Sequence, residues 1–330
     1  MLTLRTLLVT SALTLTVASA QAKDVIRVAG NFDMEHSSSL ALIKFEKELE
    51  RLSNGEIDVN IFPAQQLGGA AENVQAVKIG AVELMWVGTA YLTRTVPELE
   101  IIGLPFQFPD RKAAFDIVDG PVGAALDKAM AAEGLTSMGY MELGFRNLTN
   151  NIRPITTVDD IKRLKIRLQP NETHLATFRA LGANPVAMDV KELYSAMEQG
   201  VIDGQENPFA IINVAGYAEV QKYISNTGHF FDFISVVSNK KWFDSLEPNT
   251  KEIVREAMTI AIDYQRGLAA EQDSLGLNTL IQKGMTYTEV SPELASDLRE
   301  KTANVATETK KRLDPDLVTL LDSEVSKLGM

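Results

Sequence analysis

The chain has 330 residues, of which 45% are hydrophobic, and it has no cysteine and a formal net charge of −12. An acidic chain is poorly suited to bind nucleic acid or an anionic membrane surface. The lack of cysteine excludes disulfides, thiol catalysis and thiolate metal sites, and the length is sufficient for two domains.

The first 22 residues have the features of a secretory signal peptide. Arg5 precedes an apolar run over residues 7–17, and small residues follow as Ala-Ser-Ala and Ala-Gln-Ala over 18–22. A run this short is not expected to span a bilayer as a stable helix, and no later segment approaches about 18 uninterrupted apolar residues. No cysteine follows that could carry a lipid anchor. We therefore expect residues 1–22 to be removed and the mature chain to be soluble.

Hydrophobic periodicity predicts alternating strands and helices in two successive halves. In the first half, strands are expected over 25–29, 57–61 and 82–87, and helices over 37–52 and 70–79. The same order begins again at Leu164, with a strand, a helix over 173–181, a strand near Val186, a helix over 190–199 and a strand over 201–203. Two βαβαβ units, each with a mainly parallel sheet, explain this pattern.

Two extended segments are predicted to cross between the halves, at 139–150 and 229–238, as hinge strands above a cleft. Beyond Lys240 the pattern is helical, with helices expected over 248–283, 291–311 and 315–328. The first is longer than an average helix, so we expect it to bend or to pack across both domains. The predicted boundaries are 23–144 plus about 233–272 for domain I, 145–232 plus about 273–310 for domain II, and about 311–330 for a C-terminal helix.

The chain lacks sequence signals for catalysis. His36, His174 and His229 include no pair at metal-ligand spacing, and we expect them to be surface or core residues. No nucleophile elbow, Gly-rich phosphate loop or H-E-x-x-H helix is present. We expect no catalytic residue, no metal and no cofactor.

Two strand arginines are candidate anion-binding residues. Arg146 lies in the first crossing segment, and Arg167 lies three residues before Pro170, where Asn171 can cap the next helix. In open α/β sheets, ligands bind beyond the carboxyl ends of the strands, and a guanidinium can hold a carboxylate through two parallel hydrogen bonds. A solvated sheet face is the commoner explanation for one isolated strand arginine, so the residues alone leave both interpretations open.

Three blocks of the second half carry a more specific signal, and a fourth supports it. They are LKIRLQP (164–170), LATFRALGANPVAM (175–188), ELYSAMEQGVIDGQENP (192–208) and FPAQQLGG (62–69). They resemble the DctP-type substrate-binding proteins of tripartite ATP-independent periplasmic (TRAP) transporters. The resemblance implies an α/β, two-domain, type II-like periplasmic binding protein, with a ligand cleft between the domains, hinge strands and a long helix spanning both domains. It further implies a non-enzymatic periplasmic receptor that delivers a carboxylate to TRAP membrane permease subunits. We expect this receptor to be a monomer.

Site residues follow from the same resemblance. Arg167 would form the main salt bridge to the ligand carboxylate and Arg146 a supporting one. Asn207 would line the cleft, and Asn31, just after the first strand, would face the ligand. Further candidates for ligand contact are Glu72, Trp86, His229, Phe231 and Asp232. Core packing is an equally good explanation for Trp86 and Phe231.

The ligand prediction rests on this mixture of polar and aromatic residues, which suits a hydroxylated acid. We expect a sugar acid such as a uronate or an aldonate. Sialate is disfavoured, because Gly88 and Tyr91 stand about where relatives that bind sialate tend to carry an acidic and a basic residue. A C4-dicarboxylate or another carboxylate remains an alternative, as do a ligand-presenting sensor subunit and a secreted acid-processing enzyme.

Overall fold

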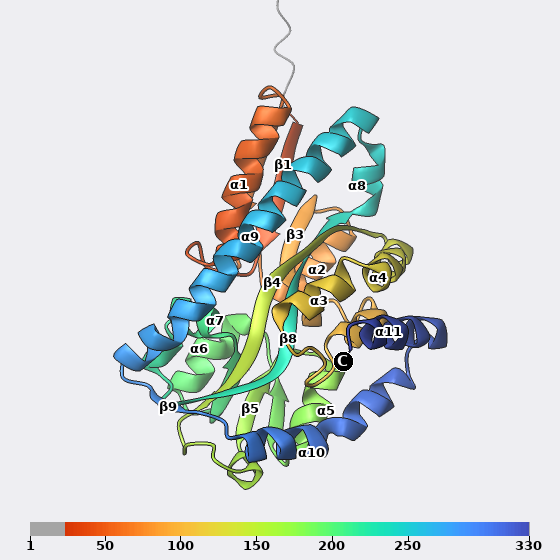
Figure 1. Cartoon of the computed structure of the whole chain (residues 1–330). Coiled ribbons are helices and arrows are strands. Elements are labelled where there is room, and N and C mark those ends of the chain that lie inside the picture. Colours follow the sequence, from red (N-terminus) through yellow and green to blue (C-terminus); the bar gives the residue numbers. More distant parts are fainter. Residues whose placement is uncertain (1–23, 330) are drawn as a thin grey trace, which may run out of the picture.

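The computed structural model describes residues 24–329, and the predicted signal peptide lies outside this range (Figure 1). A search of the described residues finds no helix that is both long and apolar enough to cross a membrane. Two lobes, one above the other in Figure 1, share a single sheet. We call residues 24–134 lobe I and residues 151–222 lobe II.

The strands form one nine-stranded sheet rather than two separate ones. The strands are β1 (Asp24–Gly30), β2 (Ile57–Phe62), β3 (Leu84–Gly88), β4 (Leu135–Asn150), β5 (Lys165–Leu168), β6 (Asn184–Ala187), β7 (Gly204–Asn207), β8 (Tyr223–Asn239) and β9 (Thr286–Thr288). Their order is β2-β1-β3-β8-β4-β7-β5-β6, with β9 beside β8. Pairing is parallel within each lobe, as predicted, whereas the two long strands run antiparallel to each other and join the lobes.

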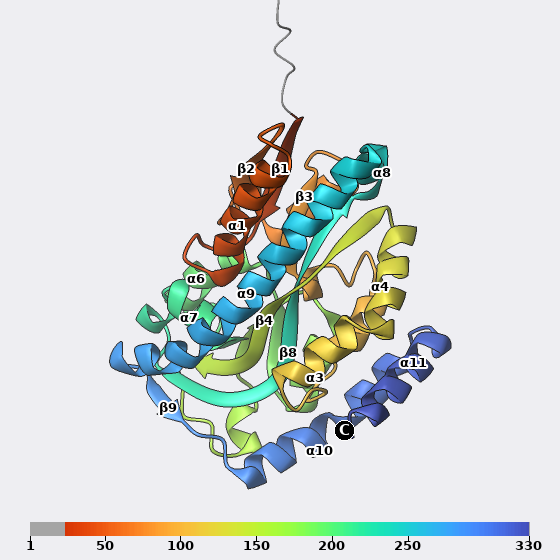
Figure 2. The same ribbon diagram turned by 45° about the horizontal axis from the view of Figure 1, so that its top comes forward.

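The crossing strands β4 and β8 are 16 and 17 residues long, and both begin earlier than the sequence pattern predicts. Figure 2 shows them curving through the middle of the molecule. The register between them shifts at Ser137/Gly139 and at Glu142/Gly144. Both glycines have a positive φ, 119° and 115°, which glycine adopts without the steric cost of a side chain. These bulges let two long strands bend from one lobe into the other.

Eleven α-helices cover the sheet within the described range. They are α1 (Ser37–Leu52), α2 (Ala70–Lys78), α3 (Arg111–Val118), α4 (Pro121–Ala132), α5 (Glu172–Ala180), α6 (Val190–Glu198), α7 (Phe209–Val214), α8 (Lys240–Ser245), α9 (Pro248–Gln282), α10 (Pro292–Lys310) and α11 (Pro315–Lys327). The seven helices that the sequence pattern predicted lie within one residue of their predicted bounds, whereas α3, α4, α7 and α8 were not predicted. The strand expected over 201–203 was wrong, because the chain bends there and β7 begins at Gly204.

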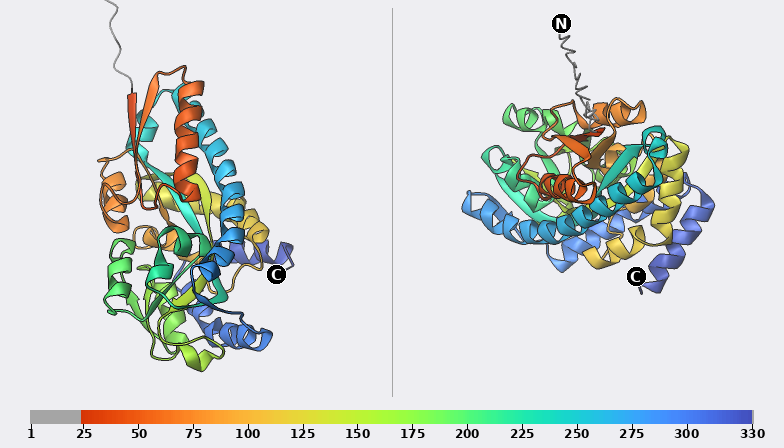
Figure 3. Two further views of the ribbon diagram at one scale, coloured as in Figure 1. Left: turned by 90° about the vertical axis from the view of Figure 1, so that its left-hand side faces the viewer. Right: turned by 90° about the horizontal axis from the view of Figure 1, so that it is seen from above.

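The 35-residue helix α9 packs against α1 of lobe I and α7 of lobe II, so the prediction that it spans both lobes is confirmed (Figure 3). Its fully buried Gln265 hydrogen-bonds to both backbone groups of Glu142 at 2.8 Å and to the Ser37 hydroxyl at 3.0 Å. The helix therefore ties the start of α1 to the crossing strand β4.

The last two helices return to different lobes. Helix α10 packs on α5 and places Leu294 and Leu298 in a core formed mainly by lobe II. Helix α11 packs on α4 and places Leu317 and Leu321 in a core formed mainly by lobe I. The C-terminal segment thus packs against both lobes.

Candidate ligand-binding site

Two pairs of parallel strands, β1 with β3 from lobe I and β5 with β7 from lobe II, run in opposite directions and end at the same place between the lobes. Asn31 follows β1, Gly88 ends β3, Gln169 follows β5 and Asn207 ends β7. All four residues line a cavity of about 200 Å³. The remaining lining residues are Phe32, Asp33, His36, Gln65, Tyr91, Leu143, Arg167, Val190, Lys191, Tyr194, Ile211, Val214, Ala215 and Tyr217. This is where open α/β sheets collect ligands.

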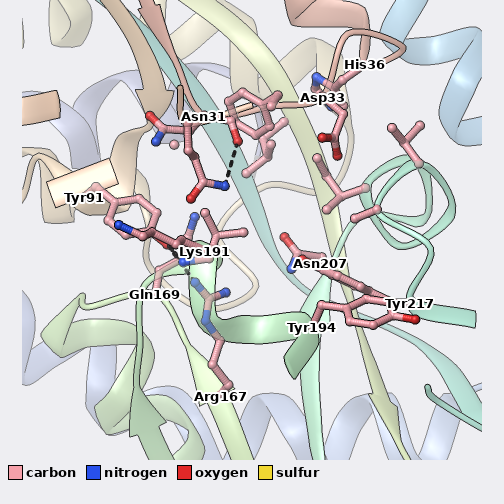
Figure 4. A pocket seen from close by; sticks show the side chains of 18 residues that line it. Asn31, Asp33, His36, Tyr91, Arg167, Gln169, Lys191, Tyr194, Asn207 and Tyr217 are labelled. Carbon is pink, nitrogen blue, oxygen red and sulfur yellow. Dashed lines mark hydrogen bonds between the residues drawn. The ribbon is translucent and has the colours of Figure 1, made fainter. Parts of the chain in front are cut away.

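Arg167 rises into this cavity from β5 (Figure 4). Its side chain is buried, with Nε donating to the Met188 carbonyl at 2.9 Å and Nη2 donating to the Tyr91 hydroxyl at 2.7 Å. Within residues 24–329 it forms no ion pair and Nη1 makes no hydrogen bond. Two donors therefore fix the guanidinium in place, while its charge stays uncompensated by protein carboxylates. Such a group is suited to bind an anion.

Tyr91 belongs to lobe I, and its hydroxyl contacts the Arg167 guanidinium of lobe II. Its hydroxyl oxygen accepts a hydrogen bond from the Val190 backbone N–H at 3.0 Å as well as the one from Arg167. Burial raises the pKa of this phenol, so it stays protonated at neutral pH. Since both lone pairs are used, the hydroxyl proton remains available for a ligand oxygen.

Side-chain amides around the cavity carry polar atoms without partners. Asn31 is 6% exposed, and neither its Nδ2 nor its Oδ1 has a hydrogen-bond partner among residues 24–329. The Oε1 atoms of Gln65 and Gln169 are likewise buried and unpartnered. Asn207 donates from Nδ2 to Gln205 at 2.6 Å, which leaves its own carbonyl oxygen as an acceptor. Buried polar atoms are normally paired, so this concentration around one cavity indicates a polar ligand.

The loop between β1 and α1 adds Asp33 and His36 to the lining. Helix α9 holds this loop, because Gln272 accepts from the Ser37 backbone N–H at 2.9 Å and donates to the Glu35 carbonyl at 2.8 Å. In Figure 4 both residues lie above the cavity, with Arg167 on its other side. The site is therefore assembled from both lobes and is supported by the helix that spans them.

Arg146 lies elsewhere, in a buried charge network across β7, β4 and β8. Its Nε and Nη2 bind the Glu206 carboxylate, Nη2 also binds the Glu206 carbonyl at 2.6 Å, and Nη1 lies 3.3 Å from the Asp232 carboxylate. His229 Nε2 is 3.2 Å from the same glutamate, and its Nδ1 is 2.7 Å from the Thr227 hydroxyl. Burial opposes ionisation of Glu206, but Arg146 and His229 outweigh it and hold its pKa at about 2.

The other residues predicted to contact the ligand lie in the hydrophobic core, in this charge network or on the surface near the cavity. Phe231 is a core residue, and Trp86 packs against Gly30, where an added Cβ would lie 2.1 Å from the indole. Together with the network residues Arg146, His229 and Asp232, they do not line the cavity. Glu72 is exposed and accepts from the Gly69 backbone N–H, with Lys191 of the lining 3.5 Å away. The lining therefore includes Arg167, Asn207 and Asn31 among the predicted residues.

Several lining residues were not predicted as ligand contacts: Asp33, His36, Gln65, Tyr91, Gln169 and Lys191. Gln169 was detectable, because it stands at the carboxyl end of a strand in the same way as Asn31. Tyr91 was not, because its role depends on contacts with β5 and α6 that only the packed lobes create.

The fold and this cavity define a class of protein. Two lobes joined by crossing strands, with an uncompensated arginine between them, form a binding protein for an anionic solute. Residues 29–312 match the DctP family model, described as bacterial extracellular solute-binding protein, family 7. The chain therefore belongs to this family and is a TRAP periplasmic solute-binding protein rather than an enzyme, as the sequence resemblance predicted.

Individual relatives are similar over most of their length. The crystal structure of the sugar acid binding protein DctPAm from Advenella mimigardefordensis, in complex with galactonate, is 30% identical, has a TM-score of 0.90 and covers 92% of this chain and 98% of its own. The 2,3-diketo-L-gulonate-binding periplasmic protein YiaO of Escherichia coli K12 is 31% identical over 86% of this chain and 84% of its own. The C4-dicarboxylate-binding periplasmic protein DctP of Rhodobacter capsulatus is 29% identical, covering 86% of each chain.

Proposed function

We propose that this protein captures a sugar acid, a uronate or an aldonate, and delivers it as a monomer to the membrane permease subunits of a TRAP transporter. The observation that carries the proposal is the chemistry of the cavity: one uncompensated arginine surrounded by amide oxygens without partners. The arginine suits the carboxylate of such a ligand, and the amide oxygens suit its hydroxyl groups.

The arginine end suits a carboxylate. Arg167 is 1% exposed and has no acidic partner among the described residues, and Tyr91 adds a neutral donor beside it. A ligand carboxylate there would offset the desolvation of the guanidinium and accept charge-assisted hydrogen bonds. Arg146 is not available for this role, because its ion pairs with Glu206 and Asp232 occupy it.

The rest of the cavity suits hydroxyl groups. Acceptors are numerous, because no donor in the described part of the chain reaches the side-chain oxygens of Gln65, Gln169, Asn207 and Asn31. Hydroxyls donate to such acceptors, whereas an ionised second carboxylate could only accept. Tyr194 presents its ring, because its hydroxyl is held by Glu219 at 2.8 Å, and a ring face suits the carbon side of a sugar.

Size supports the same class of ligand. The cavity has a volume of about 200 Å³. One small, compact acid fills that space, and an oligosaccharide does not. The relatives named above for galactonate and diketogulonate support a sugar acid, and the one named for C4-dicarboxylates keeps that alternative in the test.

The test is a binding screen of the mature chain, refolded from denaturant to release any acid carried from the host. Galactonate, galacturonate, gluconate, succinate and neutral galactose would be compared by thermal shift and then by calorimetry. Ligand at 1,000 times its Kd should stabilise the fold by about 4 kcal/mol. We expect a shift with sugar acids that Arg167→Ala abolishes. Tighter binding of succinate or galactose than of any sugar acid would contradict the proposal.

A further inference from the structure

We propose that Asp33 and His36 form a separate subsite at the end of the cavity remote from Arg167, which selects a ligand whose far end carries a hydroxyl and rejects one with a second carboxylate. This inference rests on the proposed function, because it names which sugar acids the receptor accepts. It makes Asp33 and His36 specificity-determining residues.

Asp33 supplies a negative charge that the protein does not neutralise. Its carboxylate lines the cavity and has neither an ion pair nor a side-chain hydrogen bond within residues 24–329. The positive side chains of the lining, Arg167 and Lys191, lie on the other side of the cavity in Figure 4. Burial, helped by the nearby charge of Glu35, raises the pKa of Asp33. A second carboxylate placed here would meet a like charge.

His36 supplies a donor beside this acceptor. Its Nδ1 lies 3.2 Å from the Ser38 backbone nitrogen, which can only donate, so Nδ1 must accept. Burial lowers the pKa of His36 to about 3, so the ring is neutral and carries its proton on Nε2. The ring stacks on Phe32 with centroids 4.7 Å apart, which fixes its plane. The available ring nitrogen is therefore a hydrogen-bond donor.

An acceptor and a donor that line the same cavity from one loop, whose turn is closed by the His36 N–H donating to the Asp33 carbonyl at 3.1 Å, match one kind of ligand group. A hydroxyl donates to Asp33 and accepts from His36 at once. A carboxylate would satisfy only His36 and be repelled by Asp33, and an ammonium would satisfy only Asp33 and face the His36 N–H. With Arg167 and Tyr91 at the other end, the cavity has a defined polarity: carboxylate at one end and hydroxyl at the other. Aldonates and uronates fit this order, and the corresponding diacids do not.

The experiment compares matched acids that differ only at the far end. Calorimetry on the refolded mature chain would measure the pairs gluconate and glucarate, galactonate and galactarate, and erythronate and meso-tartrate, together with 6-amino-6-deoxygluconate. The variants are Asp33→Asn, which keeps the shape of the side chain but removes its charge, and Glu35→Gln. Glu35 is exposed and outside the lining, so Glu35→Gln removes an equal charge two residues away as the matched control.

In the wild type we expect each hydroxy acid to bind more tightly than its diacid, and Asp33→Asn to reduce that preference by about tenfold, because like charges cost affinity for the wrong partner. Glu35→Gln should leave it within about twofold, since exposed charges are screened. This inference would be overturned if Asp33→Asn left the preference for the hydroxy acid over its diacid unchanged, or if 6-amino-6-deoxygluconate bound more tightly than gluconate. Either result would leave the Arg167-dependent binding of acids intact. Absence of binding by every acid would overturn the proposed function and this subsite together.

Discussion

Arg146 on the crossing strand β4 and Arg167 at the cavity are both buried, but they differ in whether carboxylates surround them. Arg146 on β4 is 0% exposed and is surrounded by the carboxylates of Glu206 and Asp232. Arg167 on β5 is 1% exposed and, within the described range 24–329, hydrogen-bonds only to a backbone carbonyl and a phenol. The first has its charge compensated inside the protein, whereas the second has no carboxylate partner among the described residues, which is why we propose it as the ligand contact.

This contrast shows that burial of a charge does not by itself reveal its role. The ion pairs of Arg146 with Glu206 and Asp232 join β7 of lobe II to the crossing strands β4 and β8, and removing one member leaves the others uncompensated. An arginine without a carboxylate partner is a cost to the free protein that ligand binding can relieve. The two arginines should therefore respond to mutation in opposite ways, one through stability and the other through affinity.

The largest expected effect is on stability at Arg146. Arg146→Ala should lower the free energy of unfolding by about 3–5 kcal/mol, because it leaves Glu206 and Asp232 buried without their cation. Urea denaturation of the ligand-free protein measures this. As a control, Arg179→Ala breaks only the exposed pair with Glu172 and should cost less than about 1 kcal/mol. If both variants lowered the free energy of unfolding by the same small amount, Arg146 would have no structural role.

At Arg167 the effect should appear in binding instead. Arg167→Met should weaken affinity for the best acid by about 100-fold or more, while ligand-free stability stays within about 1 kcal/mol of wild type. Calorimetry and urea denaturation on the same preparations separate the two quantities. Arg167→Lys, which keeps the charge but not the fork of donors, should fall between. If Arg167→Met strongly lowered the stability of the ligand-free protein, Arg167 would have a structural role like that of Arg146, and the contrast would be wrong.

Asp232, an ion-pair partner of Arg146, should make the stability of the protein depend on pH. Burial raises its pKa to about 6 from an ordinary 3.8, so between these values the folded state holds a proton that the unfolded chain releases. Its contribution to stability is therefore present at low pH and is lost as pH rises through about 6. Asp232→Asn cannot titrate, so its stability relative to wild type should rise on the order of 2 kcal/mol between about pH 4 and about pH 7. Parallel stability curves would contradict this, since the histidines titrate equally in both proteins.

The smallest expected effect concerns the partner of Arg167. Tyr91→Phe removes the hydroxyl that accepts from Arg167 and Val190 and offers its proton to the ligand. Affinity should fall by about tenfold, the value of one hydrogen bond to a charged group, with no change in which acid binds best. Thr93→Val, at a buried hydroxyl outside the cavity lining, is the control and should leave affinity unchanged. A change in ligand preference would assign Tyr91 a different role.

Local sequence features predicted most elements well. Helix α1 begins and ends where its apolar period does, and α11 follows the Asp314-Pro315 start signal. The failure at β7 has a physical reason: its four residues, Gly204 to Asn207, are buried although three are polar. Only pairing with other strands satisfies such side chains, as Arg146 does for Glu206, and no local pattern reports that pairing.

By itself, the sequence determined the alternation of strands and helices and the long helix, because strand ends and helix caps depend on neighbouring residues. Its motifs predicted the family and, through the resemblance, proposed Arg167, Asn207 and Asn31 as ligand contacts, and all three line the cavity. The family resemblance ranked Arg167 as the main carboxylate contact and Arg146 as a supporting one, but nothing in the sequence predicted that Arg146 has internal ion-pair partners. Tertiary structure decided that, by placing two carboxylates beside one guanidinium and none beside the other. The balance between charge and desolvation is set by atoms far apart in the chain, so only the folded molecule fixes which arginine is free to bind.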